Sequence, residues 1–338
     1  MKAAFTICTN SYWAKAKIAT ESFFKHHPEY RFCIFLLDRT DTTIDYSAIH
    51  NCEYIEVESF FPQVQELSLK YNIMELSCAV RPAIFLYMFE KGFTPVLHID
   101  SDTQTYDRFD EVEPLLETNN IVVTPHFCTP IDDGKYPSEI DFVKFGLYNL
   151  GFLAVKKSNE TIRFMNWWHS RLMKYCYNRP SESMFTDQLW VNYAPVFFEG
   201  VYILKHVGYN VANWNLYERK LERIDDTFLV NKTQRLKFIH FSYFVFNDPG
   251  QISSSQNRYT IEELPVLRKI FESYNQSLID NKHAIVSLLP SIFQEKYERN
   301  ARDLKERERM HRVTLKNKFK RKIHNVFLKL AAVFNPER

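Results

Sequence analysis

The sequence predicts an α/β fold built on a parallel sheet with helices on both faces. In the first hundred residues, short apolar runs alternate with longer amphipathic stretches, which gives the order strand, helix, strand, helix, strand. The 338 residues are 45% hydrophobic and 16% aromatic, which is enough for the large core that a sheet covered on both faces requires. The order of elements and the composition together indicate a folded α/β chain.

The predicted strands are short apolar runs, and the predicted helices carry apolar residues at intervals of three and four. The strand candidates are residues 3–9, 31–38, 52–58, 95–100, 119–126 and 146–156. The helical candidates are residues 14–27, 61–92 and 162–177, of which the second should break at Pro82. Residues 236–246 form one more apolar run in a second half of mixed character.

Charge and cysteine content exclude several classes of protein. The 43 basic residues are balanced by 41 acidic ones, which argues against a nucleic-acid-binding protein. The six cysteines include no CxxC pair, so they indicate buried thiols in a reducing compartment and not disulfides or a zinc site. No stretch approaches the roughly 20 apolar residues of a membrane helix, and the first apolar run is too short for a signal peptide. We therefore expect a cytoplasmic protein.

The last part of the sequence differs in character from the rest. From about residue 276 the chain becomes a charged helical pattern, which predicts a domain over 1–275 and a helical extension over 276–338. Residues 312–329 contain seven Lys or Arg and no acidic residue. The apolar residues that recur there at helical spacing are Leu315, Phe319, Ile323, Phe327, Leu330 and Phe334. A cationic amphipathic helix fits an anionic membrane surface, so residues 311–338 are expected to bind the inner face of the cell membrane. The alternative is a helix that docks on its own domain or on a second subunit.

Two aspartates separated by one serine follow a buried strand in "VLHIDSDTQTY", residues 96–106. Asp100 and Asp102 repel each other unless a cation, a proton or water offsets their charge. Ligands of parallel sheets bind beyond the carboxyl ends of the strands, where this pair lies. Carboxylate and phosphate oxygens together suit hard cations such as Mg²⁺ and Mn²⁺. The plain alternative is a strand end with two solvated carboxylates.

Five short motifs along the chain bear on this prediction of a metal site. They are "TNSY" (9–12), "IDSDT" (99–103), "YNLGFLAV" (148–155), "TDQ" (186–188) and "IHFSYF" (239–244). In this order and spacing the chain resembles the GT-A nucleotide-sugar transferases. It is most similar to the retaining glycosyltransferases of family eight, the group of glycogenin and the bacterial lipo-oligosaccharide galactosyltransferases. The resemblance covers roughly residues 3–246.

The resemblance implies a GT-A, Rossmann-like fold with a helical C-terminal extension, and transfer of a hexose from a nucleotide sugar. The donor would be linked to uridine diphosphate, the acceptor would be a surface glycan such as lipopolysaccharide or capsule, and the configuration would be retained. Mn²⁺ or Mg²⁺ would be held by Asp100, Asp102 and His240, and Asp187 and Gln188 would lie beside the reacting carbon. The residues expected at the donor are Thr9, Asn10, Tyr12, Arg81, Asp100, Ser101, Asp102, Asn149 and Ser242.

The sequence departs from the family after the histidine. The family has a glycine three positions and a lysine six positions after it, where this chain has Tyr243 and Phe246. The positive charge facing the leaving diphosphate would then come from Arg81 or from a residue of the segment 247–258.

Alternatives remain open at this level. A lone histidine in an apolar strand, such as His240, is most often a core residue, and Tyr148, Trp214 and Tyr217 are read as ordinary core. A metal-dependent phosphohydrolase of the haloacid-dehalogenase type also carries a D-x-D pair after a strand, but as D-x-D-x-T near the N-terminus, where this chain has Gln104 in the fifth position. Besides a glycosyltransferase and a phosphohydrolase, a third possible class is a non-catalytic protein that has the same fold and binds sugar or membrane.

Overall fold

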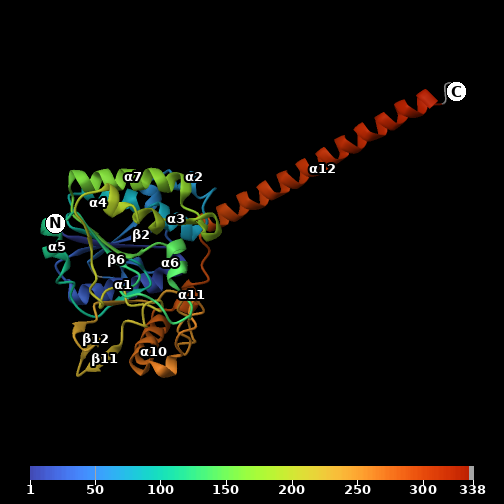
Figure 1. Ribbon diagram of the computed structural model, residues 1–338. Coiled ribbons are helices and arrows are strands. Elements are labelled where there is room, and N and C mark those ends of the chain that lie inside the picture. The colour runs from blue at the N-terminus through green and yellow to red at the C-terminus, as the bar shows by residue number, and fades with distance from the viewer. Residues whose placement is uncertain (50, 335–338) are drawn as a thin grey trace.

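The computed structural model describes residues 1–49 and 51–334 and shows a mixed α/β fold around one large sheet (Figure 1). The sheet has seven strands in the order β10-β6-β7-β4-β1-β2-β3. Their bounds are β1 Ala3–Cys8, β2 Arg31–Leu36, β3 Cys52–Glu56, β4 Val96–Ile99, β6 Ile121–Pro125, β7 Tyr148–Val155 and β10 Val201–Ile203. The predicted α/β class is confirmed, and each strand candidate of the first half has a matching strand.

The sheet is not wholly parallel, which corrects the prediction. β7 pairs antiparallel with both β4 and β6, whereas β1–β2, β1–β4, β2–β3 and β6–β10 are parallel pairs. All eight residues of β7 are buried. A strand that is buried on both faces is apolar throughout, whether it pairs parallel or antiparallel. The apolar pattern of the sequence therefore does not determine how the strand pairs.

Helices cover both faces of the sheet and divide the core in two. On one face lie α1 (Trp13–His26), α5 (Val112–Thr118) and α10 (Pro265–Asp280), and on the other lie α2 (Val64–Leu67), α3 (Ile73–Ala79), α4 (Arg81–Glu90) and α7 (Asn159–Tyr175). Neighbouring residues of β1 contribute to different cores, since Ala4 faces the first group and Phe5 the second. This alternation is the geometry of a strand buried on both sides.

The predicted helical stretch 61–92 consists of three helices. Asn72 begins α3 with a capping box in which its side chain accepts from the Glu75 backbone N–H at 3.0 Å. The break expected at Pro82 lies at Val80, because proline is tolerated in the first turn of α4. The remaining helices are α6 (Glu139–Phe145), α8 (Gln188–Val191), α9 (Ala194–Phe197), α11 (His283–Val286) and α12 (Ile292–Phe334).

Three small sheets lie outside the large one. β5 (Thr103–Thr105) pairs antiparallel with β14 (Phe238–His240), and this pairing bears directly on the site. The other two are β8 (Asn178–Arg179) with β9 (Met184–Phe185), and β11 (Leu221–Ile224) with β12 (Thr227–Val230) and β13 (Gln234–Arg235).

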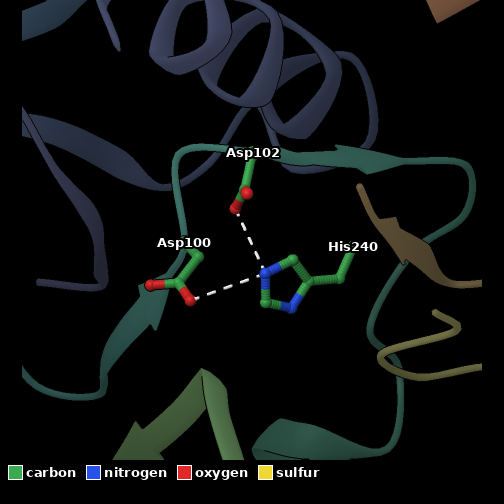
Figure 2. Close-up of side chains that lie close together, drawn as sticks. All are labelled: Asp100, Asp102 and His240. Carbon is green, nitrogen blue, oxygen red and sulfur yellow. Dashed lines mark ion pairs between the residues drawn. The ribbon is translucent and has the colours of Figure 1, made fainter. Parts of the chain in front are cut away.

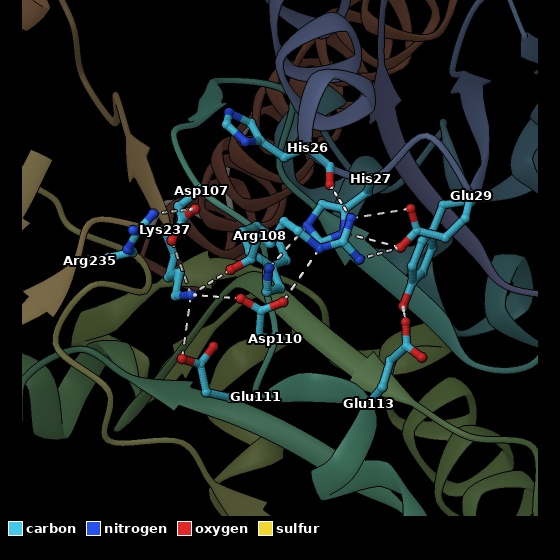
Figure 3. Close-up of polar contacts among 12 residues, drawn as sticks. His26, His27, Glu29, Asp107, Arg108, Asp110, Glu111, Glu113, Arg235 and Lys237 are labelled. Atoms are coloured by element: carbon cyan, nitrogen blue, oxygen red, sulfur yellow. Dashed lines mark hydrogen bonds and ion pairs between the residues drawn. The ribbon is translucent and has the colours of Figure 1, made fainter. Parts of the chain in front are cut away.

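A network of charged residues fixes the chain after β5 to the residue that precedes β14 (Figure 3). The buried Lys237 Nζ lies 3.4 Å from carboxylate oxygens of both Asp107 and Glu111, and donates to the Arg108 carbonyl at 2.6 Å. Arg108 in turn pairs with Glu29 at 2.6 Å. The start of β14 is therefore held by several ion pairs at once.

The predicted boundary at residue 276 does not coincide with the point at which the chain leaves the packed body. The predicted boundary falls inside α10, whose Tyr274 and Leu278 both belong to the core. The first turns of α12 also pack on the body, where Phe293 is buried and Asn300 Nδ2 donates to the Leu69 carbonyl at 2.7 Å. Residues 302–330 of α12 are exposed, and the helix projects away from the body (Figure 1).

Within the described residues, no helix is both long enough and apolar enough to cross a membrane. The predicted membrane-binding segment lies on α12, except for residues 335–338, which are outside the described residues.

Candidate active site

A cavity of about 560 Å³ opens at the carboxyl ends of β1 and β4. It gathers residues from parts of the sequence that are more than two hundred positions apart. The predicted site residues that line it are Thr9, Tyr12, Arg81, Asp100, Ser101, Asp102, Asn149, Asp187, Gln188, His240 and Ser242. Asn10 is the predicted residue that does not line it.

The two aspartates and His240 lie together at this cavity (Figure 2). One ligand atom from each lies within 4.8 Å of the others. His240 Nε2 is 3.1 Å from Asp102 Oδ1 and 3.7 Å from Asp100 Oδ2. His240 is therefore part of the acidic cluster and not an ordinary core histidine.

The backbone explains how residues so far apart in sequence meet. Asp100 directly follows β4, and its N–H donates to the Gly151 carbonyl of β7 at 3.0 Å. The chain turns at once into β5, with the Thr103 hydroxyl donating to the Asp100 carbonyl at 2.8 Å. Because Thr103 pairs with His240 in the β5–β14 ladder, the histidine is brought directly to the turn that carries both aspartates.

The charges of the three side chains alter one another's pKa. Burial raises the pKa of Asp100 to about 6, against the opposing effect of Arg81 and His240. Burial also acts to raise the pKa of Asp102, but the charge and hydrogen bond of His240 lower it to about 2. Burial acts to lower the pKa of His240, and Asp102 overcomes that effect and raises it. The cluster thus favours a positive charge between two carboxylates, which a proton on His240 or a divalent cation can supply.

The donor set fits a hard or borderline divalent cation, since it offers two carboxylates and one imidazole. The second nitrogen of the histidine is also placed: His240 Nδ1 lies 3.2 Å from Asn210 Oδ1. The Asn210 amide donates to Asn149 Oδ1 at 2.9 Å. Such outer contacts fix the ring orientation of a metal-ligating histidine, so Asn149 acts on the cluster through Asn210.

Arg81 lines the cavity and lies between two carboxylates. It is 5% exposed, pairs directly with Asp187 and contacts Asp100 Oδ1 at 3.2 Å. The Asp187 carbonyl also accepts from Trp168 Nε1 at 3.1 Å. Two carboxylates already offset the positive charge of this guanidinium. Its contacts therefore do not favour the expected role of Arg81 in binding a diphosphate.

Gln188 begins α8 beside the cavity. Its Nε2 donates to the Phe145 carbonyl at 2.7 Å, which fixes the plane of the amide. Thr186, two residues earlier, has a φ of +45°, a conformation that costs free energy for a β-branched residue. Strain of this kind is concentrated at functional sites, and here it immediately precedes Asp187 and Gln188.

Asn10 points away from the cavity. Its amide donates to the Arg39 carbonyl at 2.8 Å and accepts from the Tyr46 hydroxyl at 2.6 Å. Its backbone N–H donates to Asp38, whose pKa is raised to about 6 by burial. Asn10 thus ties the end of β1 to the end of β2, while Thr9 and Tyr12 remain at the cavity.

Several cavity residues were missed by reasoning from the sequence. Trp214 is buried in a small core cluster with Phe142 and Ala212, as predicted, but it also lines the cavity and packs edge-on against His240 with ring centroids 5.4 Å apart. Lys15 also lines it, and the available signal was its place one helical turn after Tyr12. The other aromatic residues of the lining are Tyr136, Phe142, Phe145, Phe185, Tyr243 and Phe244. Tyr148 is buried, as predicted.

Comparison with known proteins gives weak matches. No family model matches the chain. The uncharacterized protein YfnF of Bacillus subtilis (strain 168) is 24% identical over 149 residues, which are 44% of this chain and 49% of that protein. The uncharacterized protein YfnD of the same strain is 23% identical over 217 residues, 63% of this chain and 67% of that protein. The match to YfnF thus spans about half the length of that relative.

Among solved structures, similar chains carry glycosyltransferase names. The galactosyltransferase LgtC in complex with donor and acceptor sugar analogues is 16% identical, with a TM-score of 0.45 over 82% of this chain and 100% of that chain. Mouse xyloside xylosyltransferase 1 is 12% identical, with a TM-score of 0.44 over 71% and 97% of the two chains. GlyE of Streptococcus pneumoniae TIGR4 is 13% identical, with a TM-score of 0.43 over 86% and 66%. Likenesses at this level establish no shared activity, so the residues of the cavity must carry any functional conclusion.

Proposed function

We propose that this chain is a metal-dependent glycosyltransferase of the GT-A type, which moves a hexose from a nucleotide sugar to a glycan acceptor. One observation carries the proposal: a single cavity unites the Asp100–Asp102–His240 cluster with Asp187 and Gln188. A site for a hard cation beside a buried acid–amide pair suits a substrate with a diphosphate next to a reacting carbon.

The cation would be Mn²⁺ or Mg²⁺, held by Asp100, Asp102 and His240. When bound, such an ion offsets the negative charge that develops on a departing diphosphate. The protein's own part is to hold the two carboxylates and His240 Nε2 within reach of one ion, and His240 would lose its proton when the ion binds. The hydrogen bond that His240 Nδ1–H donates to Asn210 Oδ1 and the tight turn between β4 and β5 fix that arrangement.

The donor would lie along the cavity, with its base near Thr9 and Tyr12 and its sugar near Gln188. Ser101 lies between the two aspartates and Ser242 two residues after His240, so their hydroxyls would be within the region of the phosphates and sugar. Gln188, fixed by the Phe145 carbonyl, would present its side-chain oxygen to the reacting carbon. A uridine diphosphate sugar as donor, a surface glycan as acceptor and retention of configuration are the parts that rest on the family resemblance.

The exposed part of α12 would bind an anionic membrane and so bring the cavity to a membrane-bound acceptor. Between residues 312 and 329 its cations are unopposed by any acid, and Phe319 and Phe327 are each 66% exposed. Exposed phenylalanines among lysines are typical of helices that lie in a lipid interface.

A panel of nucleotide sugars in a thermal-shift assay, with and without Mn²⁺, tests the proposal. A ligand that binds only the folded protein raises the melting temperature, and the proposal expects a UDP-sugar to do so only when Mn²⁺ is present. Asp102→Asn should abolish this shift, since the amide removes one anionic ligand and keeps the shape of the side chain.

The two alternative classes give different results in the same experiments. A phosphohydrolase would release inorganic phosphate from a phosphate monoester without any acceptor. A non-catalytic binding protein would show no transfer of sugar to any acceptor, even where a nucleotide sugar raises the melting temperature.

A further inference from the structure

The cavity contains only two Lys or Arg side chains among the residues that the structure describes, Arg81 and Lys15. Arg81 is engaged by Asp187 and Asp100, as shown above. Phe246, at the position where the family resemblance predicts a lysine, packs against the core and against the ring of His283 at 4.9 Å. The cation expected from that position is therefore absent, and one lysine at the cavity is left to provide it.

Lys15 lies on the first turn of α1, which follows β1 after a short 3-10 turn over Asn10–Tyr12. It is half-buried, and its Nζ lies 4.5 Å from the centroid of the Tyr12 ring. Within residues 1–49 and 51–334, no carboxylate forms an ion pair with it. By contrast, Lys17 on the same helix pairs with Glu21 at 3.7 Å.

Lys15 shares the cavity with the acidic cluster, since Lys15, Asp102 and His240 all line it. Helix α1, which carries Lys15, also packs against β5, the strand that directly follows Asp102: the Thr105 N–H donates to Ser22 Oγ at 3.0 Å. The ammonium is therefore available to the phosphates of a nucleotide whose metal the cluster would hold.

We propose that Lys15 binds the diphosphate of the nucleotide donor and replaces the lysine that is absent at residue 246. This inference rests on the proposed function. A lysine ammonium is a compact point charge on a flexible stem and suits phosphate oxygens. The amino end of α1 adds the positive end of its dipole on the same side. Contact with the Tyr12 ring holds the ammonium at the cavity while no ligand is bound.

Calorimetric titration of the full-length chain tests this assignment with three probes: UDP with Mn²⁺, inorganic pyrophosphate with Mn²⁺, and Mn²⁺ alone. Lys15→Gln should weaken UDP and pyrophosphate binding by a similar factor of about tenfold or more, because the lost contact lies on the part that both ligands share. Mn²⁺ alone should bind as before or more tightly, since a nearby positive charge has been removed. Lys15→Arg should restore most of the UDP affinity.

Lys17→Gln is the matched control, because Lys17 lies on the same helix and does not line the cavity. It should leave all three affinities within about twofold. If Lys15→Gln weakens UDP but not pyrophosphate, Lys15 positions Tyr12 and the inference is wrong. Unchanged UDP affinity in Lys15→Gln would overturn it directly. If wild-type protein binds neither UDP nor pyrophosphate in the presence of Mn²⁺, the proposed donor is wrong and the inference is lost with it.

Discussion

Gly151 and His240 lie in such close contact that a Cβ atom on Gly151 would come within 2.5 Å of Nδ1 of the imidazole. The same glycine accepts from the Asp100 N–H at 3.0 Å through its carbonyl and donates to Asn149 Oδ1 at 2.9 Å through its N–H. The backbone of one residue thus contacts Asp100, His240 and Asn149 at once. No side chain fits at this position without displacing the ring.

Gly151→Ala should therefore damage the metal site more than the fold. The added methyl group forces His240 away from Asp100 and Asp102, so Mn²⁺ affinity should fall more than tenfold and sugar transfer should fall with it. Overpacking should also lower the free energy of unfolding by about 1–3 kcal/mol. Titration with Mn²⁺ and a melting curve measure the two effects. Gly250→Ala is the control, because its nearest neighbour would be Asp248 Oδ1 at 3.4 Å. Normal Mn²⁺ affinity in Gly151→Ala would contradict the role of His240 as a ligand.

Gln188→Ala should reduce kcat far more than it weakens donor binding. Its proposed place is at the reacting carbon, and an interaction made only in the transition state changes turnover and not ground-state affinity. A loss of about 100-fold in kcat with KM within about threefold is expected, in the range seen when one stabilising group is removed. Steady-state kinetics with varied donor concentration gives both values. A normal kcat with a raised KM would instead place Gln188 in the donor pocket.

Arg81→Met should destabilise the protein strongly, because it leaves the buried Asp187 without its partner. Breaking a buried ion pair by removing one member costs about 3–5 kcal/mol. The double variant Arg81→Met with Asp187→Asn should lose less than the sum of the two single changes, since no unpaired charge remains. Arg163→Met is the surface control: Arg163 pairs with Glu160 at 2.5 Å in an exposed setting, and its loss should lower the free energy of unfolding far less than the loss of Arg81. Additive single effects would show that Arg81 and Asp187 do not act as a pair.

His27 should make the fold sensitive to mild acid. Burial lowers the pKa of His27 to about 4, and the positive charge of Arg108 is the next cause (Figure 3). His27 Nε2 accepts from the Phe109 N–H at 3.1 Å, a contact that requires the neutral ring. Between about pH 6.5 and 4 the unfolded chain binds a proton at this residue and the folded chain does not, so stability falls as the pH falls through this range and is constant above it.

The contribution of this one histidine has an upper bound of about 3 kcal/mol over that range. His27→Gln keeps an acceptor for Phe109 and removes the titration, so its free energy of unfolding should depend less steeply on pH between 6.5 and 4. Urea unfolding at a series of pH values measures the slope. His311→Gln, on the exposed part of α12, serves as the control and should leave the slope unchanged. An unaltered slope in His27→Gln would show that other buried histidines account for the whole effect.

Much of the cavity could be predicted from the sequence, because buried runs mark the strands and polar residues directly after them mark one edge of the sheet. Thr9, Asp100 and Asp102 were found in this way. His240 required more, since only the order of distant motifs separated it from an ordinary core histidine. Local patterns could not show that β14 pairs with β5, although this pairing is what brings the ring to the aspartates.

Other features depend on contacts that have no local signal. Asn10 follows the first strand as Thr9 does, but bonds to Arg39 and Tyr46 from distant segments turn it from the cavity. A lysine in the first turn of a helix is usually solvated, so Lys15 did not stand out. The charged pattern after residue 276 concealed a helix face that is buried in the body, because α10 is amphipathic and exposes its polar side.

Deleting residues 311–338 should release the protein from anionic vesicles and leave transfer to a soluble acceptor intact. Over residues 292–330, α12 contacts the body through its first turns, for example through Lys296 and Asn300, and residues 311–330 are exposed, so we expect the cavity to be independent of the deleted part. Each Lys or Arg near an anionic surface contributes about 1 kcal/mol, and the seven between residues 312 and 329 give ample attraction after discounting for distance and screening.

The apolar residues of the same helix decide how salt acts on this binding. Leu315 is 51% and Ile323 42% exposed, at helical spacing with the two phenylalanines, so insertion should add a contribution that salt does not abolish. Binding should weaken steeply between low and high ionic strength but not disappear. Replacing Lys316, Lys318, Lys320 and Lys322 by Gln is the matched variant, which keeps the helix and the apolar residues and should reduce the salt-dependent part alone. Vesicle co-sedimentation measures both forms. If the truncated protein sediments like the full chain, another surface binds the membrane. If the full chain instead dimerises through this helix and does not bind vesicles, the exposed apolar residues pack against a second subunit.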